Sequence, residues 1–322
     1  MNVGIIGAGG IAKKMAFTLN GMEDATCYGI ASRSIEKVQE FAQEFNIEHA
    51  YGSYEEMMQD DAIDLVYVAV PHSHHKDCAM LAISYGKPVL CEKAFMANAK
   101  QAKEVLDYAK EKNVFITEAI WTRYMPSRQI IDDVIASGII GDVATVTANL
   151  SYNIQHVERL FKPELAGGAL LDVGVYAINF AFMVLGSDYK DVASNCVKND
   201  LGVDLQSGMI FTYDNGTMAV LYSSAYGPSE QYGIVVGSKG YLIAKNINNI
   251  DVIEVYNEDR ELLESHTVPE QITGFEDQVR ASMRAIKAGE IECSEMPHAE
   301  IMKVMETMDG LRADWGIKYP FE

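Results

Sequence analysis

The sequence predicts an α/β fold that continues into an α+β fold: a doubly wound parallel sheet followed by a mostly antiparallel open sheet. In residues 1 to about 118, short apolar strand patterns alternate with amphipathic helical patterns, as parallel strands and their crossover helices do. From about 190 to 267, apolar and polar residues alternate in short runs, and Asp214-Asn215-Gly216 joins two of these runs as a hairpin signal. With 322 residues, the chain is long enough for two domains.

The elements of the first part are bounded by local signals. Ser53 and Glu56 have capping-box spacing, and Gly86 closes a helix. Strands are predicted over 2–6, 25–31, 63–70, 88–91 and 114–117, with helices over 35–45, 73–85 and 98–112 and a first helix ending near 19. A helix over 126–137 and a strand over 143–152 follow. The second part has strands predicted over 208–213, 217–223, 232–236, 241–244, 252–256 and 262–268, then helices over 274–288 and 298–315.

The first predicted strand leads directly into the glycine-rich turn Gly7-Ala8-Gly9-Gly10-Ile11-Ala12. The first glycine permits a tight turn, the second lets backbone approach a phosphate, and the small Ala12 lets helix pack on strand. The helix N-terminus adds N-H groups and a partial positive charge. A tight structural turn is the alternative. In this context the pattern predicts a Rossmann-type dinucleotide site at Gly7, Gly9, Gly10 and Ile11.

The end of the second predicted strand indicates which dinucleotide binds. An NAD site usually carries an Asp or Glu there for the ribose hydroxyl, whereas this chain has Ser32-Arg33-Ser34. Arg33 can bind a 2'-phosphate with two hydrogen bonds, so Ser32 and Arg33 predict NADP(H) as the preferred cofactor, with NAD(H) possible. The alternative is that Ser34 caps the following helix and Arg33 is only solvated.

Composition excludes several classes of protein. The formal net charge of -20 repels nucleic acid and anionic membranes. No apolar run is expected to reach the roughly 18 residues of a membrane span, and Met1 precedes the first strand without a signal peptide, so a cytoplasmic location is predicted. Cysteines 27, 78, 91, 196 and 293 are far apart and predict reduced, buried thiols rather than a metal site.

Two local patterns carry residues suited to chemistry. Lys93 follows a strand in Glu92-Lys93-Ala94, which places it at the carboxyl edge of the sheet where ligands bind. Asp172 and Tyr176 are four residues apart in a predicted helix and share a face. A tyrosine beside an ammonium group can exchange the proton of an alcohol whose carbon loses a hydride. The alternatives are a surface Lys93 paired with Glu92 and a core Tyr176, but Asp172 lies in an apolar run and requires a partner.

Further candidates follow two other strands. Trp121, Arg123 and Tyr124 suit a polyol pocket, although packing is an equal alternative for Trp121. His72, His74 and His75 come after Pro71. No acid or cysteine with ligand spacing accompanies them, so we expect Pro71, His72 and His75 to flank the cofactor and no metal to bind.

Taken together, these motifs resemble a known family, glucose-fructose oxidoreductase, inositol dehydrogenase and MocA (Gfo/Idh/MocA). The resemblance rests on GIIGAGGIA, VPHSHH, LCEKAF, GGALLDVGVYAIN and the final YPF. WTRYMP and Tyr176 look most like the branch of dimeric dihydrodiol dehydrogenase and D-xylose dehydrogenase. The resemblance implies that Lys93 and Tyr176 are catalytic, that Asp172 supports them, and that Gly7, Gly9 and Arg33 bind the dinucleotide.

The resemblance also implies a division into domains. The sequence departs from the family pattern at Ala94 and at His72. Residues 1–120, completed by a C-terminal helix at about 298–322, are expected to form the dinucleotide-binding domain. Residues 121–297 are expected to bind substrate and to form a homodimer, or a dimer of dimers, through the open sheet. The usual Glu-Lys-Pro is Glu-Lys-Ala here, so Ala94 predicts a less rigid Lys93. His72 stands where many members have Asn.

The leading hypothesis is an NADP-dependent oxidoreductase that interconverts CH-OH and C=O on a sugar, a cyclic polyol or a trans-dihydrodiol. Lys93 and Tyr176 would transfer the proton while the hydride passes to nicotinamide. One alternative is a non-catalytic, NADP-binding metabolite sensor or regulator partner. Another is redox-assisted hydrolysis of a glycoside, in which the hydride leaves and returns.

Overall fold

A computed structural model describes residues 1–322, and the chain divides into two compact units. The first comprises 1–121 and 271–305, and the second 122–270 and 306–322. The domain plan expected from the sequence differs for 271–297 and for 306–322. Residues 271–297 belong with the first unit because helix α8 (Phe275–Ala288) packs on helix α1 (Gly10–Asn20), and the hydroxyls of Thr18 and Thr273 hydrogen-bond at 2.6 Å.

The first unit contains a six-stranded parallel sheet in the order β3-β2-β1-β4-β5-β6. Its strands are β1 (Asn2–Ile6), β2 (Thr26–Ala31), β3 (His49–Tyr51), β4 (Leu65–Val68), β5 (Val89–Glu92) and β6 (Ile116–Ala119). The order reverses between β1 and β4, where the carboxyl ends of an open α/β sheet form a binding crevice. The doubly wound prediction is confirmed. Strand β3 was not predicted, because its three residues, of which the middle one is exposed, form no apolar run.

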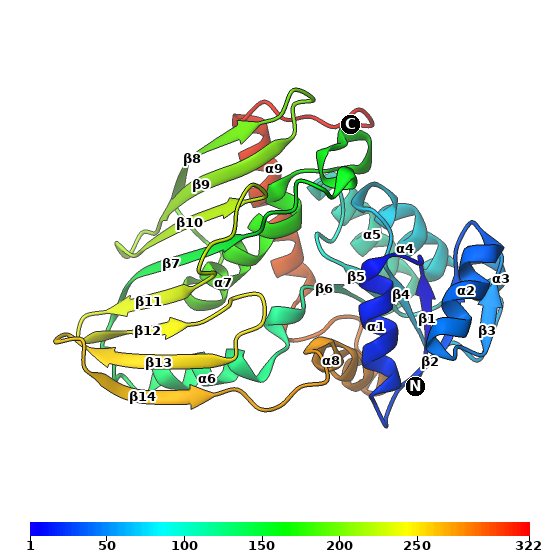
Figure 1. Cartoon of the computed structure of the whole chain (residues 1–322), viewed down its shortest axis with the longest axis horizontal. Coiled ribbons are helices and arrows are strands. Elements are labelled where there is room, and N and C mark those ends of the chain that lie inside the picture. The colour runs from blue at the N-terminus through cyan, green and yellow to red at the C-terminus, as the bar shows by residue number, and fades with distance from the viewer. The chain divides into compact units, whose positions relative to one another are not determined.

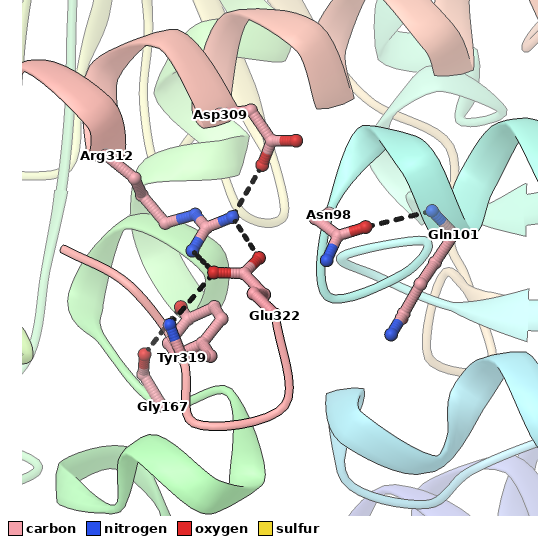
Figure 2. Close-up of polar contacts among 7 residues, drawn as sticks. All are labelled: Asn98, Gln101, Gly167, Asp309, Arg312, Tyr319 and Glu322. Atoms are coloured by element: carbon pink, nitrogen blue, oxygen red, sulfur yellow. Dashed lines mark hydrogen bonds and ion pairs between the residues drawn. The ribbon is translucent and has the colours of Figure 1, made fainter.

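Two helices of this unit, α2 and α5, begin after residues whose side chains cap them. Helix α2 (Ile35–Phe45) has the predicted bounds and is capped by Ser34, whose side chain accepts from the Lys37 amide. Asn98 caps α5 (Ala99–Lys112) by accepting from the Gln101 amide at 2.9 Å (Figure 2). The remaining helical segments are α3 (Tyr54–Met58), η1 (His72–His74), α4 (His75–Ser84) and residues 298–305 of α9 (His298–Asp314).

The second unit contains an eight-stranded sheet in the order β14-β13-β12-β11-β7-β10-β9-β8 (Figure 1). Every neighbouring pair is antiparallel except β7 with β10. The strands are β7 (Val143–Ser151), β8 (Asp191–Lys198), β9 (Asp204–Thr212), β10 (Met218–Ser224), β11 (Gly233–Gly237), β12 (Gly240–Ala244), β13 (Val252–Asn257) and β14 (Leu262–Thr267). The predicted mostly antiparallel open sheet is confirmed.

One face of this sheet is covered by helix. Helix α7 (Val175–Leu185) packs on β7, β10 and β11, and α6 (Pro126–Ala136) lies beside β13. Strands β9 and β10 alternate buried and exposed residues, as strands with one solvated face do. The exposed positions include Ile210, Met218, Val220 and Tyr222, so the open face carries large apolar side chains.

The segment that leads into α7 is long and apolar enough to cross a membrane by length and composition, although Asp172 and Asn179 interrupt its apolar residues. Residues Pro163–Leu185 form 23 helical or near-helical residues, and an 18-residue window within them has a mean hydropathy of 1.8. However, 83% of the apolar window is buried inside the structure. A helix that is apolar on all sides is typical of a protein core as well as of a membrane.

Candidate active site

The glycine turn between β1 and α1 combines tight packing with open space. Gly7 has a φ of +105°, and a Cβ there would lie 2.4 Å from the Ala69 carbonyl oxygen. A Cβ at Gly9 or at Gly10 would meet nothing within 4 Å. Gly9 begins α1 without a side-chain cap, and the first turn contains no acidic residue. The turn therefore fits a pyrophosphate, which needs free helical N-H groups and room beside the backbone.

The structure at the end of β2 is compatible with both interpretations of Ser32-Arg33-Ser34, a helix cap and a binding site for a phosphate. The Ser32 hydroxyl donates to the Ser34 carbonyl oxygen at 3.1 Å, and Ser34 caps α2 as the alternative expected. Arg33 is exposed and forms no ion pair with the protein. Its guanidinium therefore remains available to an anion.

The loop after β5 carries Lys93, which is half-buried. The Lys93 amide donates to Oε2 of Glu92 at 3.2 Å, and Nε2 of His72 lies 3.2 Å from the Lys93 carbonyl oxygen. The peptide bond between Lys93 and Ala94 is cis. Side chains from two neighbouring strand ends thus contact the backbone of Lys93 itself.

The next two residues of this loop are also held by buried side chains. Nδ1 of His75 lies 3.0 Å from the Ala94 oxygen and 3.1 Å from the Phe95 oxygen, and Nε2 lies 2.9 Å from the Val70 oxygen. Glu118 accepts from the Phe95 amide at 2.9 Å. The loop therefore has an anchor on each side even though it lacks the proline that the family pattern places after the lysine.

Burial sets the protonation of the groups around Lys93. Burial lowers the pKa of His75 to about 4, although the carbonyl oxygens that face both of its ring nitrogens oppose this fall. Burial raises the pKa of Glu92 to about 7, although the Tyr67 hydroxyl and the positive charges of Lys93 and Lys14 oppose this rise. At neutral pH, Glu92 can therefore hold or release a proton beside the lysine.

Trp121 lies in an aromatic cluster of the first unit. Its side chain is 2% exposed and meets Phe275 edge to face at 4.7 Å between ring centroids. The Lys14 ammonium lies 4.1 Å from the Trp121 centroid and 4.2 Å from that of Phe275. This geometry is typical of cation-π contacts, and burial lowers the pKa of Lys14. The indole therefore packs within the first unit, and its contact with substrate stays a prediction.

Asp172 and Tyr176 lie in the second unit at the start of the core helix. Asp172 is 9% exposed within a π-helical turn, η5 (Leu170–Gly174), and Tyr176 is 8% exposed on α7. The sequence predicted a regular helix over both. Asp172 does have the partner that a buried carboxylate requires, because the Arg159 guanidinium lies 3.3 Å from its Oδ1. Arg159 was not predicted from the sequence as a site residue. Its position in the loop before Gly167 and Gly168 was the only available signal.

Gly167 and Gly168 accommodate the protein's own atoms rather than a ligand. A Cβ at Gly167 would lie 2.6 Å from the Leu160 carbonyl oxygen. Gly168 has a φ of +128°, and a Cβ there would lie 2.2 Å from Oδ1 of Asp204. Asp204 is 1% exposed and accepts from the Leu170 amide at 2.6 Å, and burial raises its pKa to about 6. The sequence did not single out Asp204, because its predicted strand began only at Gly208.

Arg123 and Tyr124, expected to contact substrate, are buried in the second unit. Arg123 is 7% exposed, and its Nε donates to Oδ1 of Asn179 at 2.6 Å. Asn179 in turn donates to the Val175 carbonyl oxygen on α7 at 2.8 Å. Tyr124 is 9% exposed. Arg123 therefore braces the helix that carries Tyr176.

In the first unit, the structure brings the predicted cofactor residues together at one edge. The turn at Gly7, the segment Pro71-His72 and the loop at Lys93 follow β1, β4 and β5, which are neighbours in the sheet, and Arg33 follows β2. Asp172 and Tyr176 are separate from these residues in the chain and belong to the other unit. The strand order and the glycine turn at the switch point define the class of dinucleotide-binding Rossmann-fold proteins.

Comparison with known proteins identifies the family within that class. Residues 1–119 match the family model described as the oxidoreductase family with an NAD-binding Rossmann fold, and 129–243 match the GFO/IDH/MocA C-terminal domain. A trans-1,2-dihydrobenzene-1,2-diol dehydrogenase of Xenopus tropicalis is 32% identical over an alignment that covers 98% of each chain. The chain belongs to the Gfo/Idh/MocA family of oxidoreductases.

NADP occurs in the name of one further similar protein and in the solved complex of another. A D-xylose 1-dehydrogenase (NADP(+)) of Haloferax volcanii is 32% identical over 97% of this chain and 96% of its own. A solved 3-ketoreductase of Actinomadura kijaniata, in complex with NADP and TDP-benzene, has a TM-score of 0.89 at 25% identity and covers 97% of each chain. The enzyme class and the NAD(P)-binding fold expected from the sequence are confirmed.

Proposed function

We propose that the protein is an NADP-dependent dehydrogenase that interconverts CH-OH and C=O on a sugar, a cyclic polyol or a trans-dihydrodiol. The carrying observation is Lys93, fixed after β5 at the sheet edge that also bears the open glycine turn. The relatives that act on D-xylose and on a dihydrodiol support this range of substrates.

The preference for NADP is supported by Arg33. No carboxylate follows β2 before Glu36, and the Arg33 guanidinium is exposed and unpaired at the position where a 2'-phosphate would bind. Gly7, Gly9, Gly10 and Ile11 would hold the pyrophosphate. Ser32 would assist Arg33, and Pro71, His72, His75 and Glu92 would flank the nicotinamide side directly or through the Lys93 loop.

The proposed chemistry gives Lys93, Tyr176 and Asp172 separate tasks. When bound, the oxidised nicotinamide accepts the hydride that leaves the CH-OH carbon. Tyr176, as a phenolate whose charge the Lys93 ammonium stabilises, would take the hydroxyl proton and become a phenol, and the same ammonium would stabilise the charge that develops on the substrate oxygen. Asp172, paired with Arg159, orients the substrate. Among the remaining predicted substrate residues, Trp121, Arg123 and Tyr124 would act mainly by supporting these groups.

We further propose that two copies pair through the open face of the eight-stranded sheet, as a homodimer or as part of a dimer of dimers. Ile210 and Val220 lie directly opposite each other on β9 and β10 and are 40% and 39% exposed. Met218 and Tyr222 extend this exposed apolar patch along β10. Contiguous apolar patches on a sheet face commonly mark a protein interface.

A cytoplasmic location is also proposed. All five cysteines are free, four are buried and Cys196 is partly so. Burial raises the pKa of Cys27, Cys78 and Cys293 to about 12, which keeps these thiols unreactive. Unpaired cysteines are typical of a reducing compartment.

The test is reduction of the cofactor followed by absorbance. Purified protein is mixed with NADP+ or NAD+ and with aldoses, inositols and trans-dihydrodiols in turn. Turnover with one class, faster with NADP+, is expected. NADPH binding without turnover on any class would contradict the dehydrogenase and favour the metabolite sensor instead.

A further inference from the structure

We propose that Tyr319, held by the final residues of the chain, is a positioning residue for the segment Gly167–Tyr176. Its hydroxyl donates to the Gly167 carbonyl oxygen at 2.9 Å, as Figure 2 shows. This inference rests on the proposed function, because it assigns Tyr319 a task only if Asp172 and Tyr176 act on the substrate.

The hydrogen bond between Tyr319 and Gly167 is buried, and the Tyr319 hydroxyl is its donor. Tyr319 is 2% exposed, and Gly167 is also buried. Burial raises the pKa of Tyr319, so the hydroxyl keeps its proton and acts as donor. A buried carbonyl oxygen that loses its donor cannot turn to water without moving its backbone. The Tyr319 hydroxyl therefore fixes the position of the Gly167 carbonyl group.

The tail that carries Tyr319 is fixed by a buried arginine. Arg312, 4% exposed on α9, donates through Nη1 and Nη2 to the two carboxylate oxygens of Glu322 at 3.1 and 2.8 Å, and through Nη2 to Asp309 at 2.7 Å (Figure 2). Its guanidinium carbon lies 4.4 Å from the Tyr319 ring centroid, and the Tyr319 amide donates to Glu322 at 2.9 Å. A bidentate pair of charged hydrogen bonds between a guanidinium and a carboxylate fixes the relative orientation of the two groups.

Asp204 holds the same segment at a second point. It accepts from the Leu170 amide, and it lies so close to Gly168 that no side chain fits between them. Gly167 and Leu170 are therefore both anchored immediately before Asp172. A displacement of 1 Å at a reacting group can cost on the order of 100-fold in rate, so anchors at this place bear on turnover.

The test compares Tyr319→Phe with Tyr213→Phe. The Tyr213 hydroxyl donates to the Gly186 carbonyl oxygen, also at 2.9 Å, at the opposite end of α7. Both variants lose one tyrosine-to-carbonyl bond in the same unit. For Tyr319→Phe we expect kcat to fall about 10-fold or more with little change in KM and in NADPH affinity. For Tyr213→Phe we expect kcat to remain within about twofold of wild type.

Hydrogen exchange read by mass spectrometry supplies a readout that needs no substrate. Exchange in peptides covering 167–176 should accelerate in Tyr319→Phe and not in Tyr213→Phe. Glu322→Gln, which loosens the tail while keeping Tyr319, should show the same pattern more weakly and serves if Tyr319→Phe does not fold. Unchanged exchange in 167–176, or an equal kcat in the two tyrosine variants, would overturn the inference.

The proposed function fails separately from this inference. Tyr176→Phe with wild-type kcat would remove Tyr176 from the chemistry, whereas the exchange of 167–176 in Tyr319→Phe would be unaffected by that result.

Discussion

At the scale of single residues, two glycines of one turn have opposite tasks. Gly7 is required by the fold, since an alanine there would place its Cβ against the Ala69 carbonyl at positive φ. We expect Gly7→Ala to lower the free energy of unfolding by about 1 to 3 kcal/mol from backbone strain alone. Denaturant titration of the purified variant measures this. An unchanged midpoint would contradict the packing described at this turn.

Gly9, in contrast, is not required by the packing of the fold. A Cβ there meets no protein atom within 4 Å, so Gly9→Ala should fold with wild-type stability. If the pyrophosphate occupies that space, the methyl group should raise the Kd for NADPH about 10-fold or more, or about 1.4 kcal/mol. Fluorescence titration tests this, with the denaturation midpoint as control. Wild-type affinity would place the pyrophosphate elsewhere.

Arg33 tests the choice between the two cofactors. A guanidinium on the 2'-phosphate contributes on the order of 1.5 to 3 kcal/mol, so Arg33→Ala should raise the Kd for NADPH more than 10-fold and hardly change that for NADH. Lys37→Ala, which removes an exposed charge from the first turn of the same helix, is the control. Equal effects of Arg33→Ala on both nucleotides would rule out the assignment.

At the scale of elements, the turn η5 and the start of α7 depend on Asp204. Burial raises the pKa of Asp204 from 3.8 to about 6, so the folded state binds its proton more tightly than the unfolded state does. The stability that this protonation contributes is fully present below about pH 3.8 and is lost as the pH rises through 6.

Comparison with Asp204→Asn isolates this contribution. The wild-type free energy of unfolding, minus that of the variant, should increase by about 2 kcal/mol as the pH falls from 7 to 4. Urea denaturation at several pH values measures the difference. A difference that is constant with pH would show that Asp204 titrates normally in the folded protein.

Elements with local signals could be predicted from the sequence, and contacts set by distant residues could not. The bounds of α2 follow from the Ser34 cap and an amphipathic pattern, and both are local. The hydrogen bond from the Leu170 amide, at the start of the π-helical turn, to Asp204 could not be predicted because the two residues are 34 positions apart in the chain. Arg159 beside Asp172 and the anchors of the Lys93 loop were missed for the same reason. The strand-end positions of the predicted motif residues could be derived from the sequence, because each follows a local apolar run.

At the scale of the whole molecule, the sequence placed the change of fold near residue 120 but not the return of the chain to the first unit. Residues 271–297 join the first unit through contacts of α8 with α1, and no local composition marks them. The two-unit plan therefore depends on packing between segments more than 250 residues apart, such as Thr18 and Thr273.

Self-association is predicted at this scale as well. Sedimentation of the wild-type protein at micromolar concentration should show a dimer or a dimer of dimers. Val220→Lys places a charge in the middle of the exposed patch opposite Ile210, and we expect it to lower the assembly state without unfolding the chain. Lys239→Ala, outside this patch, is the control. A monomeric wild type would exclude pairing through this face.

The central claim, that Lys93 takes part in hydride-coupled proton transfer, is tested most directly by kcat for Lys93→Met. Lys100→Met, at an exposed position on α5, is the matched control. We expect Lys93→Met to lower kcat by on the order of 10²- to 10⁴-fold while the Kd for NADPH and the Tm stay near wild type. A Lys93→Met variant with near wild-type kcat would contradict the proposed mechanism.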